Sequence, residues 1–199
     1  MEPNSTTTPP KKRKGLEKVL YDLVHRRQRF RQLFGAVFVF LLTFAGEPTP
    51  GLLGLGAIFV VLGMVVRMWA SGCVKKNRVL ATSGPYAFVR HPLYVGNILI
   101  CAGFCVTSGL WWSWPLGIVL LLLFYPPAIA YEDQKLRGLF PDQWDGWAIK
   151  TPALIPRLSA WEESKGAEWS WKQSLYKNGE PVYVAIMVGC LAFLWTQLG

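Results

Sequence analysis

The sequence predicts an all-α, polytopic membrane helical bundle with about five spans. Hydrophobic residues make up 52% of the 199 residues, and the mean hydropathy is positive. All 21 Lys and Arg residues lie within the segments 11–31, 67–90 and 135–177. Apolar runs separate these segments from connectors that carry no basic residue. A membrane-spanning fold would therefore place every cation on one side, as the positive-inside rule expects for the cytoplasm.

The N-terminal part of the chain is divided by two changes of composition. Residues 1–14 are polar and rich in Thr, Pro and Lys, so we expect a disordered basic tail. This tail lacks the apolar segment and cleavage site of a signal peptide, so we expect no removal of the N-terminus. Residues 15–32 join a helical apolar stripe to a basic run, which predicts a basic amphipathic helix at the lipid headgroups. Residues 33–199 would form the membrane domain.

Apolar runs supply the predicted spans. The first is shorter than the roughly 20 residues that cross a bilayer squarely, and the last is marginal. Gly54, Gly56 and Gly63 fall in the second run. Because small residues let helix backbones approach closely, we expect the first and second runs to form a tight hairpin. The predicted spans are 33–45, 52–69, 93–110, 116–131 and 182–198.

The later spans have recognisable ends. A cluster of Trp residues at 111–114 marks the interface opposite the basic one. Pro126 and Pro127 lie near the basic-side end of the fourth span, where tandem prolines predict a break or kink. A short amphipathic helix is expected next, over 131–140. The net charge of +9 follows the membrane topology, so no nucleic-acid partner is expected.

The cysteines are scattered in or beside the apolar runs. Cys101 and Cys105 are one helical turn apart, but no further His or Cys is placed to complete a metal site. Small packing residues are the better interpretation. We therefore expect no disulfide framework and no metal.

A polar stretch between the second and third spans is the first candidate site. Residues 83–96 read SGPYAFVRHPLYVG. Pro92 suits the first turn of a helix, so Arg90 and His91 would lie just before a helix N-terminus. That place supplies backbone N–H groups and a cation for an anionic ligand. A plain headgroup-binding loop with Tyr86 and Tyr94 in an aromatic belt is the alternative interpretation.

An acidic pair after the fourth span is the second candidate site. Glu132 and Asp133 would lie at the membrane end of the predicted amphipathic helix. Carboxylates there can accept hydrogen bonds from hydroxyls or from an ammonium group. Residues 144–157 then continue with more Trp and Pro than an ordinary linker contains.

Together these two motifs resemble those of the integral-membrane methyltransferases that include isoprenylcysteine carboxyl methyltransferases and phosphatidylethanolamine N-methyltransferases. The stretch 83–96 resembles the first family motif. The second is matched by Glu132 and Asp133 with residues 136–156, and the resemblance covers about 67–158. The second motif departs from its usual form in that an aspartate, a proline and two tryptophans stand in place of a glutamate, a glycine and two tyrosines. The departing residues are Asp133, Pro141, Trp144 and Trp147.

The resemblance implies binding of S-adenosylmethionine in a cytoplasmic pocket that is not a Rossmann fold, and the GxGxxG fingerprint is indeed absent from the sequence. It implies catalytic roles for Arg90, His91 and Glu132. The acceptor would be a lipid or another membrane-dissolved molecule, and membrane lipid would surround the bundle. The implied cofactor-binding residues are Tyr86, Arg90, His91, Pro92, Tyr94, Gly96, Glu132 and Asp133.

The nature of the acceptor stays open at the sequence level. An isoprenylcysteine-type carboxylate is ionised at neutral pH and needs no base. A phospholipid amine must lose a proton, which makes His91 or Glu132 the candidate base. Two other functions compatible with the sequence are an NADPH-dependent membrane sterol or acyl reductase, which carries a similar Arg-His-Pro motif, and a non-catalytic membrane scaffold.

Overall fold

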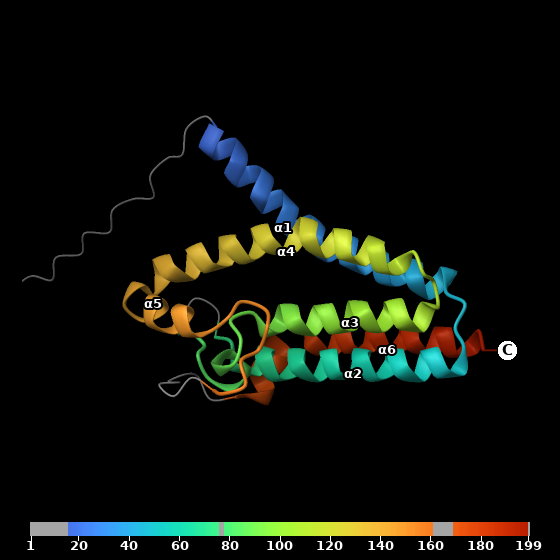
Figure 1. Ribbon diagram of the computed structural model, residues 1–199. Coiled ribbons are helices and arrows are strands. Elements are labelled where there is room, and N and C mark those ends of the chain that lie inside the picture. The colour runs from blue at the N-terminus through green and yellow to red at the C-terminus, as the bar shows by residue number, and fades with distance from the viewer. Residues whose placement is uncertain (1–15, 76–77, 161–168, 199) are drawn as a thin grey trace, which may run out of the picture.

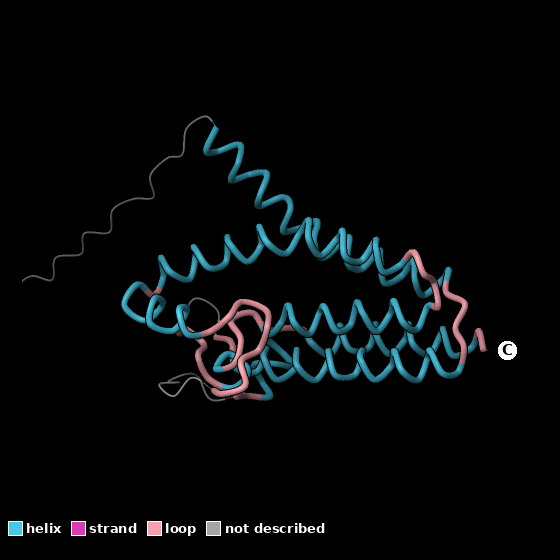
Figure 2. The backbone as a smooth tube through the Cα atoms, in the orientation of Figure 1, coloured by secondary structure: helices cyan, strands magenta, loops and turns pink. Residues whose placement is uncertain are grey.

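A computed structural model describes residues 16–75, 78–160 and 169–198, with side chains from residue 31 onward. Every regular element in these ranges is helical, which confirms the all-α class (Figures 1 and 2). The predicted tail 1–14 lies outside the described residues. The elements are α1 (Leu16–Ala45), α2 (Pro50–Cys73), the 3₁₀ turn η1 (Gly84–Ala87), α3 (Pro92–Ser108), α4 (Ser113–Leu139), α5 (Pro141–Lys150), the π-helical turn η2 (Gln173–Lys177) and α6 (Glu180–Thr196).

The bundle has two layers. Helices α2, α3 and α6 lie side by side, and α4 crosses above them together with the C-terminal half of α1 (Figure 1). The N-terminal half of α1 diverges from the bundle. The main apolar core lies where α1, α2, α3 and α6 meet. Its buried members are Phe38, Val39, Leu42, Leu53, Val60, Met64, Ile100, Phe104, Cys105, Met187, Cys190 and Leu194.

A seam of glycines joins α2 to α3. A Cβ added to Gly63 would lie 2.6 Å from the carbonyl oxygen of Gly96, and one added to Gly103 would lie 2.7 Å from that of Gly56. The predicted hairpin of the first two apolar runs is therefore wrong, because the close approach is between α2 and α3. Both helices carry small residues seven positions apart, so each presents a smooth strip to the other.

The first and fourth helices are longer than predicted. Residues 16–45 form one continuous helix, so the separate interfacial helix predicted over 15–32 is the N-terminal part of α1. Helix α4 continues through Pro126 and Pro127 to Leu139, so the short helix predicted over 131–140 is the last part of α4 and not a separate helix. The helix is visibly curved (Figure 1), as expected where prolines remove backbone donors and crowd the preceding turn.

The ends of α3 define the two ends of the molecule. The helix begins at Pro92, as predicted, and stops at Gly109, whose φ of 68° closes it in the left-handed region. At this second end the backbone N–H of Glu47 donates to Ser108 O over 2.8 Å, which ties together the two connectors without basic residues. Turn η1 and helix α5 lie at the opposite end (Figure 1).

The outer surfaces of two helices suit a membrane. By length and composition, α2 and α4 are the candidate spans found among the described residues. In their most apolar windows only 28% and 17% of the residues are buried inside the protein, so their apolar faces need another apolar environment. These faces indicate a membrane-embedded protein. The apolar helical segments Arg31–Ala45, Pro92–Ser108 and Glu180–Thr196 are shorter, so the count of five spans stays a prediction.

Candidate functional site

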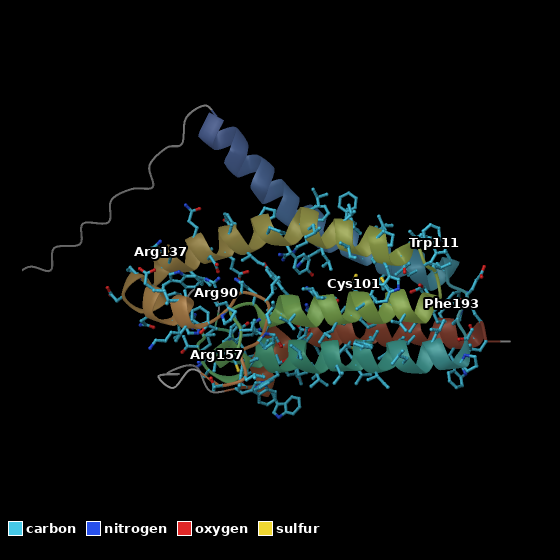
Figure 3. The ribbon with its side chains drawn as sticks, in the orientation of Figure 1. Arg90, Cys101, Trp111, Arg137, Arg157 and Phe193 are labelled. Atoms are coloured by element: carbon cyan, nitrogen blue, oxygen red, sulfur yellow. The ribbon has the colours of Figure 1, made fainter. Side chains whose placement is uncertain are left out.

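The two polar motifs meet at one end of the bundle. Arg90 Nη1 lies 3.0 Å from Asp133 Oδ2, and His91 Nε2 lies 2.9 Å from Asp133 Oδ1. The hydroxyl of Tyr94 donates to Glu132 Oε2 over 2.8 Å. The start of α3, with the two residues before it, is thus joined to the end of α4 through five side chains. Figure 3 shows Arg90 at this end, near α5.

Backbone hydrogen bonds hold the loop before α3 in place. The N–H groups of Arg90 and His91 donate to the carbonyl oxygens of Pro152 and Ala153, over 2.8 and 3.1 Å. Arg157 N returns a bond of 3.0 Å to Phe88 O. The proline-rich segment after α5 therefore runs along the loop and fixes the direction in which Arg90 and His91 leave it.

Two tryptophans of α5 complete this support. Trp147 is 1% exposed, and its indole N–H donates to Tyr86 O over 3.1 Å. Trp144 packs edge-on against Trp147 and lies 5.9 Å from the guanidinium carbon of Arg90. These residues stand where the family usually has tyrosines. Here they are buried supports of the loop, a role that sequence reasoning missed.

A cavity of about 310 Å³ opens beside the joined motifs. This volume lies at the lower end of the range of small-molecule sites, about 300–1,000 Å³. Of the predicted cofactor-binding residues, Tyr86, Arg90, His91, Tyr94 and Glu132 line the cavity. The other walls come from Arg31, Val74, Lys75, Val79, Leu80, Ala81, Leu93, Tyr131, Lys135, Leu136 and Trp147.

The two carboxylates play different structural parts. Both oxygens of Asp133 are engaged by Arg90 and His91, and Asp133 is absent from the cavity lining. Glu132 lines the cavity with a side chain that is 44% exposed. Asp133 therefore fits a positioning role, and Glu132 is the carboxylate open to a ligand.

One N–H group of the Arg90 side chain has no partner among the described residues. Its Nη1 faces Asp133, whereas its Nε is buried and has no hydrogen-bond partner among the described residues. A buried donor without a partner carries a free-energy cost that a ligand oxygen would remove. The cavity thus combines the Arg90 guanidinium with an open carboxylate, which fits the two charged groups of an amino-acid moiety such as that of S-adenosylmethionine.

Other predicted site residues lie outside the cavity. A Cβ on Gly96 would come within 2.6 Å of Arg67 Cγ, so Gly96 serves the contact with α2. Pro92 begins α3 and is also absent from the lining. The backbone donors expected at the start of α3 are largely used, because Tyr94 N and Val95 N both bond to His91 O.

Tyr86 is a neutral wall of the cavity. Burial raises the pKa of its phenol well above the ordinary value, and the nearby Glu132 carboxylate raises this pKa further. The hydroxyl therefore stays protonated throughout the physiological pH range.

A second cavity, of about 570 Å³, adjoins the first between α1, α3, α4 and α6. Its walls are mainly apolar, and its polar residues include Arg31, Arg67 and Glu180. Arg67 donates to both oxygens of Glu180, over 3.2 and 2.8 Å, and to Asn97 Oδ1 over 2.6 Å. Sequence reasoning did not assign these residues, although a charged residue inside an apolar run is the signal that could have found Arg67.

No group of three or more His, Cys, Asp or Glu side chains able to hold a metal ion is found within the described ranges.

Fold and site together define an all-helical, membrane-type protein with two polar motifs gathered around a cavity at one end. The model of the phospholipid methyltransferase family matches residues 52–143, which include α2, α3, α4 and the first motif. This region therefore resembles that family, as the motifs predicted. No solved structure matches the chain.

Similar proteins include two that are named for metal resistance. The chain is 41% identical over 114 residues to the cobalt-zinc-cadmium resistance protein CzcN of Cupriavidus metallidurans, which covers 56% of the chain and 52% of that protein. It is 34% identical over 145 residues to the nickel-cobalt-cadmium resistance protein NccN of Alcaligenes xylosoxydans xylosoxydans. This match covers 68% of the chain and 66% of that protein. The matches thus span about half to two thirds of these relatives.

A third relative carries an enzyme name. The chain is 35% identical over 83 residues to the protein-S-isoprenylcysteine O-methyltransferase of Schizosaccharomyces pombe, which covers 42% of the chain and 35% of that protein. Together with the family match, this similarity favours methyl transfer over the reductase and scaffold alternatives.

Proposed function

We propose that the protein is an S-adenosylmethionine-dependent methyltransferase that acts on a lipidic or membrane-dissolved acceptor. The observation that carries the proposal is the convergence of Arg90, His91, Tyr94 and Glu132 on the cavity of about 310 Å³. The match to the phospholipid methyltransferase family supports it.

The residues present suit the cofactor. Arg90 would bind the methionine carboxylate through the N–H groups that Asp133 leaves free. Glu132 would accept hydrogen bonds from the α-ammonium or the ribose hydroxyls. Tyr86 and Tyr94 would form the walls on either side. When bound, the cofactor supplies an electrophilic methyl group attached to a sulfonium.

The chain itself contributes alignment and the exclusion of water. In-line transfer needs the acceptor atom, the methyl carbon and the sulfur in one line, and correct placement can account for much of the rate. Asp133 fixes Arg90 and His91 relative to each other. For an amine acceptor, Glu132 or His91 would take the proton; for a carboxylate acceptor no proton moves.

The proposed topology follows the charge distribution. The apolar parts of α1, α2, α3, α4 and α6 would cross the bilayer, with the cavity at the cytoplasmic end, where the basic residues lie. The shorter helices would cross with tilt or local thinning of the bilayer.

Calorimetric titration of the full chain in detergent micelles with S-adenosylhomocysteine tests the cofactor assignment. We expect the wild type to bind, and Arg90→Ala to weaken binding by at least tenfold, because a charge-assisted hydrogen bond is lost. Arg137→Ala is the matched control, since Arg137 pairs with Asp145 and its side chain is 65% exposed. Protection of the wild type by NADPH, without binding of S-adenosylhomocysteine, would overturn the proposal.

A further inference from the structure

The two cavities are neighbours with a shared wall. Arg31, Val74 and Leu93 line both the smaller cavity, assigned above to the cofactor, and the larger one of about 570 Å³. The larger cavity is bounded elsewhere by apolar residues such as Phe38, Ile100, Leu121 and Ile186. An apolar chain placed there would have its polar end directed toward the methyl donor at the junction beside Arg31.

Arg31 differs in its surroundings from the other two arginines at these cavities. Arg67 is paired with Glu180, and Arg90 is paired with Asp133. The guanidinium carbon of Arg31 instead lies 4.5 Å above the ring of Tyr94 and 5.9 Å from that of Tyr125. Its Nη1 is buried and has no hydrogen-bond partner in the part of the chain that the structure describes. A buried cationic donor of this kind is completed by an anionic ligand.

We propose that Arg31 is a specificity-determining residue that binds the carboxylate of an amphiphilic acceptor, while the acceptor's apolar chain occupies the larger cavity. The proposal rests on the proposed function and narrows its acceptor to a carboxylate. Arg31 lies on α1, outside the family-matched region 52–143. The preference for a carboxylate acceptor would thus come from α1, a helix that precedes the region matched by the family.

The charges at the junction favour a carboxylate over an amine. The guanidinium of Arg31 attracts a carboxylate and repels an ammonium group. The ring nitrogens of His91 face Asp133 at 2.9 Å and Glu132 at 3.7 Å, so neither nitrogen is directed at the junction as a free base. A carboxylate needs no such base because it is already ionised.

The transfer step balances without a proton. A carboxylate oxygen of the acceptor forms the new O–CH₃ bond, and the S–CH₃ bond of S-adenosylmethionine breaks with its electron pair remaining on sulfur. The products are a neutral methyl ester and a neutral thioether. The negative charge of the carboxylate and the positive charge of the sulfonium are both consumed, so Arg31 holds the acid more strongly than the ester and favours release of the product.

Competition binding to the full chain in phosphatidylcholine nanodiscs tests the anion preference. The probes are hexadecanoate and hexadecylamine, and the measured quantity is the ratio of their affinities relative to wild type, which cancels their partitioning into lipid. We expect Arg31→Gln to lower the acid-to-amine ratio by about tenfold, because one charge-assisted contact is lost. Arg31→Lys should retain the acid preference and Arg31→Glu should reverse it.

The matched control is Arg137→Gln, which removes one positive charge at an exposed residue that lines neither cavity and should leave the ratio unchanged. Equal ratios in wild type, Arg31→Gln and Arg31→Glu would overturn the proposal. A drop in Arg137→Gln as large as that in Arg31→Gln would also overturn it, because net charge alone would then explain the preference.

The chemistry of the product separates this inference from the proposed function. A membrane lipid extract is incubated with the wild type and a cofactor that carries a deuterated methyl group, and the labelled lipid is treated with mild alkali. Release of the label as methanol shows a methyl ester and supports the carboxylate assignment. Label that survives alkali shows transfer to an atom other than a carboxylate oxygen, which overturns the inference and leaves the methyltransferase proposal standing. Failure of the wild type to bind S-adenosylhomocysteine would contradict both the methyltransferase proposal and the inference about Arg31.

Discussion

Asp133 holds Arg90 and His91 at once, with its two oxygens 3.0 and 2.9 Å from their nitrogens. Replacement by Asn removes the charge that both partners face and keeps the size of the side chain. We expect Asp133→Asn to weaken S-adenosylhomocysteine binding by about tenfold, because Arg90 loses its fixed orientation. Calorimetric titration measures the change.

Asp145→Asn is the control for this substitution. Asp145 also pairs with an arginine, Arg137, but the two side chains are 57% and 65% exposed. Exposed pairs contribute little to stability, about 0–1 kcal/mol. Equal losses of affinity in Asp145→Asn and Asp133→Asn would contradict the positioning role of Asp133.

The sequence predicted which residues form the candidate site better than it predicted what each residue does there. Arg90, His91, Tyr94 and Glu132 were expected around one ligand, and they do line one cavity. Arg31 falls in the segment 15–32, which was predicted to be a basic helix at the lipid headgroups. Nothing in a local pattern shows that a residue of α1 will face α3 and α4, because that contact depends on how α1 crosses the bundle. The bond from Trp147 to Tyr86 O depends in the same way on the docking of α5.

The contact between α2 and α3 at the glycine seam can be tested by replacing one of its glycines with alanine. A Cβ on Gly56 would collide with Thr107 Cγ2 and would lie 2.5 Å from Gly103 O, where backbone cannot move aside. We expect Gly56→Ala to lower the free energy of unfolding by about 1–3 kcal/mol through overpacking. Thermal unfolding in detergent, followed by circular dichroism, measures the loss.

Gly54 offers a control on the same helix. A Cβ at Gly54 meets nothing within 4 Å, and Ala favours helix over Gly by about 1 kcal/mol. Gly54→Ala should therefore leave the unfolding temperature unchanged or raise it. A decrease as large as that of Gly56→Ala would show that the seam does not set the stability of the α2–α3 contact.

The ion pair between Arg67 and Glu180 joins α2 to the start of α6. The side chains are 15% and 4% exposed, so removal of one partner leaves a charge in a poorly solvated place. We expect Glu180→Leu to cost about 3–5 kcal/mol in the free energy of unfolding, and Arg67→Met with Glu180→Leu to recover most of it. Chemical denaturation of the two variants provides the comparison. A double variant as unstable as the single one would mean that the cost comes from lost packing and not from the unpaired charge.

Sequence patterns located helix ends more reliably than helix partners. Pro92 predicted the start of α3 because its ring and missing N–H suit a first turn. Gly56 and Gly63 predicted that α2 lies close to another helix. They did not identify α3 as that helix, because the match with the glycines of α3 depends on how the two helices are placed together. Pro126 and Pro127 predicted a break or kink, and α4 runs through them as one curved helix.

The two ends of the whole molecule differ in charge. Arg90, Arg137 and Arg157 lie at the end that carries α5, and Trp111 and Phe193 lie at the other (Figure 3). The connectors at the second end, 46–49 and 109–112, contain no Lys or Arg. If the bundle spans a membrane, the positive-inside rule predicts its orientation, with α5 and the smaller cavity toward the cytoplasm.

Thiol labelling of intact cells tests this orientation, in a variant whose four cysteines are replaced by Ala. Trp111→Cys and Leu158→Cys place single thiols at opposite ends, and both positions are well exposed, at 80% and 104%. A membrane-impermeant maleimide should label Trp111→Cys directly and Leu158→Cys only after permeabilisation. Labelling of both positions from outside would contradict a spanning bundle, and the opposite pattern would place the cofactor cavity on the side where S-adenosylmethionine is not made.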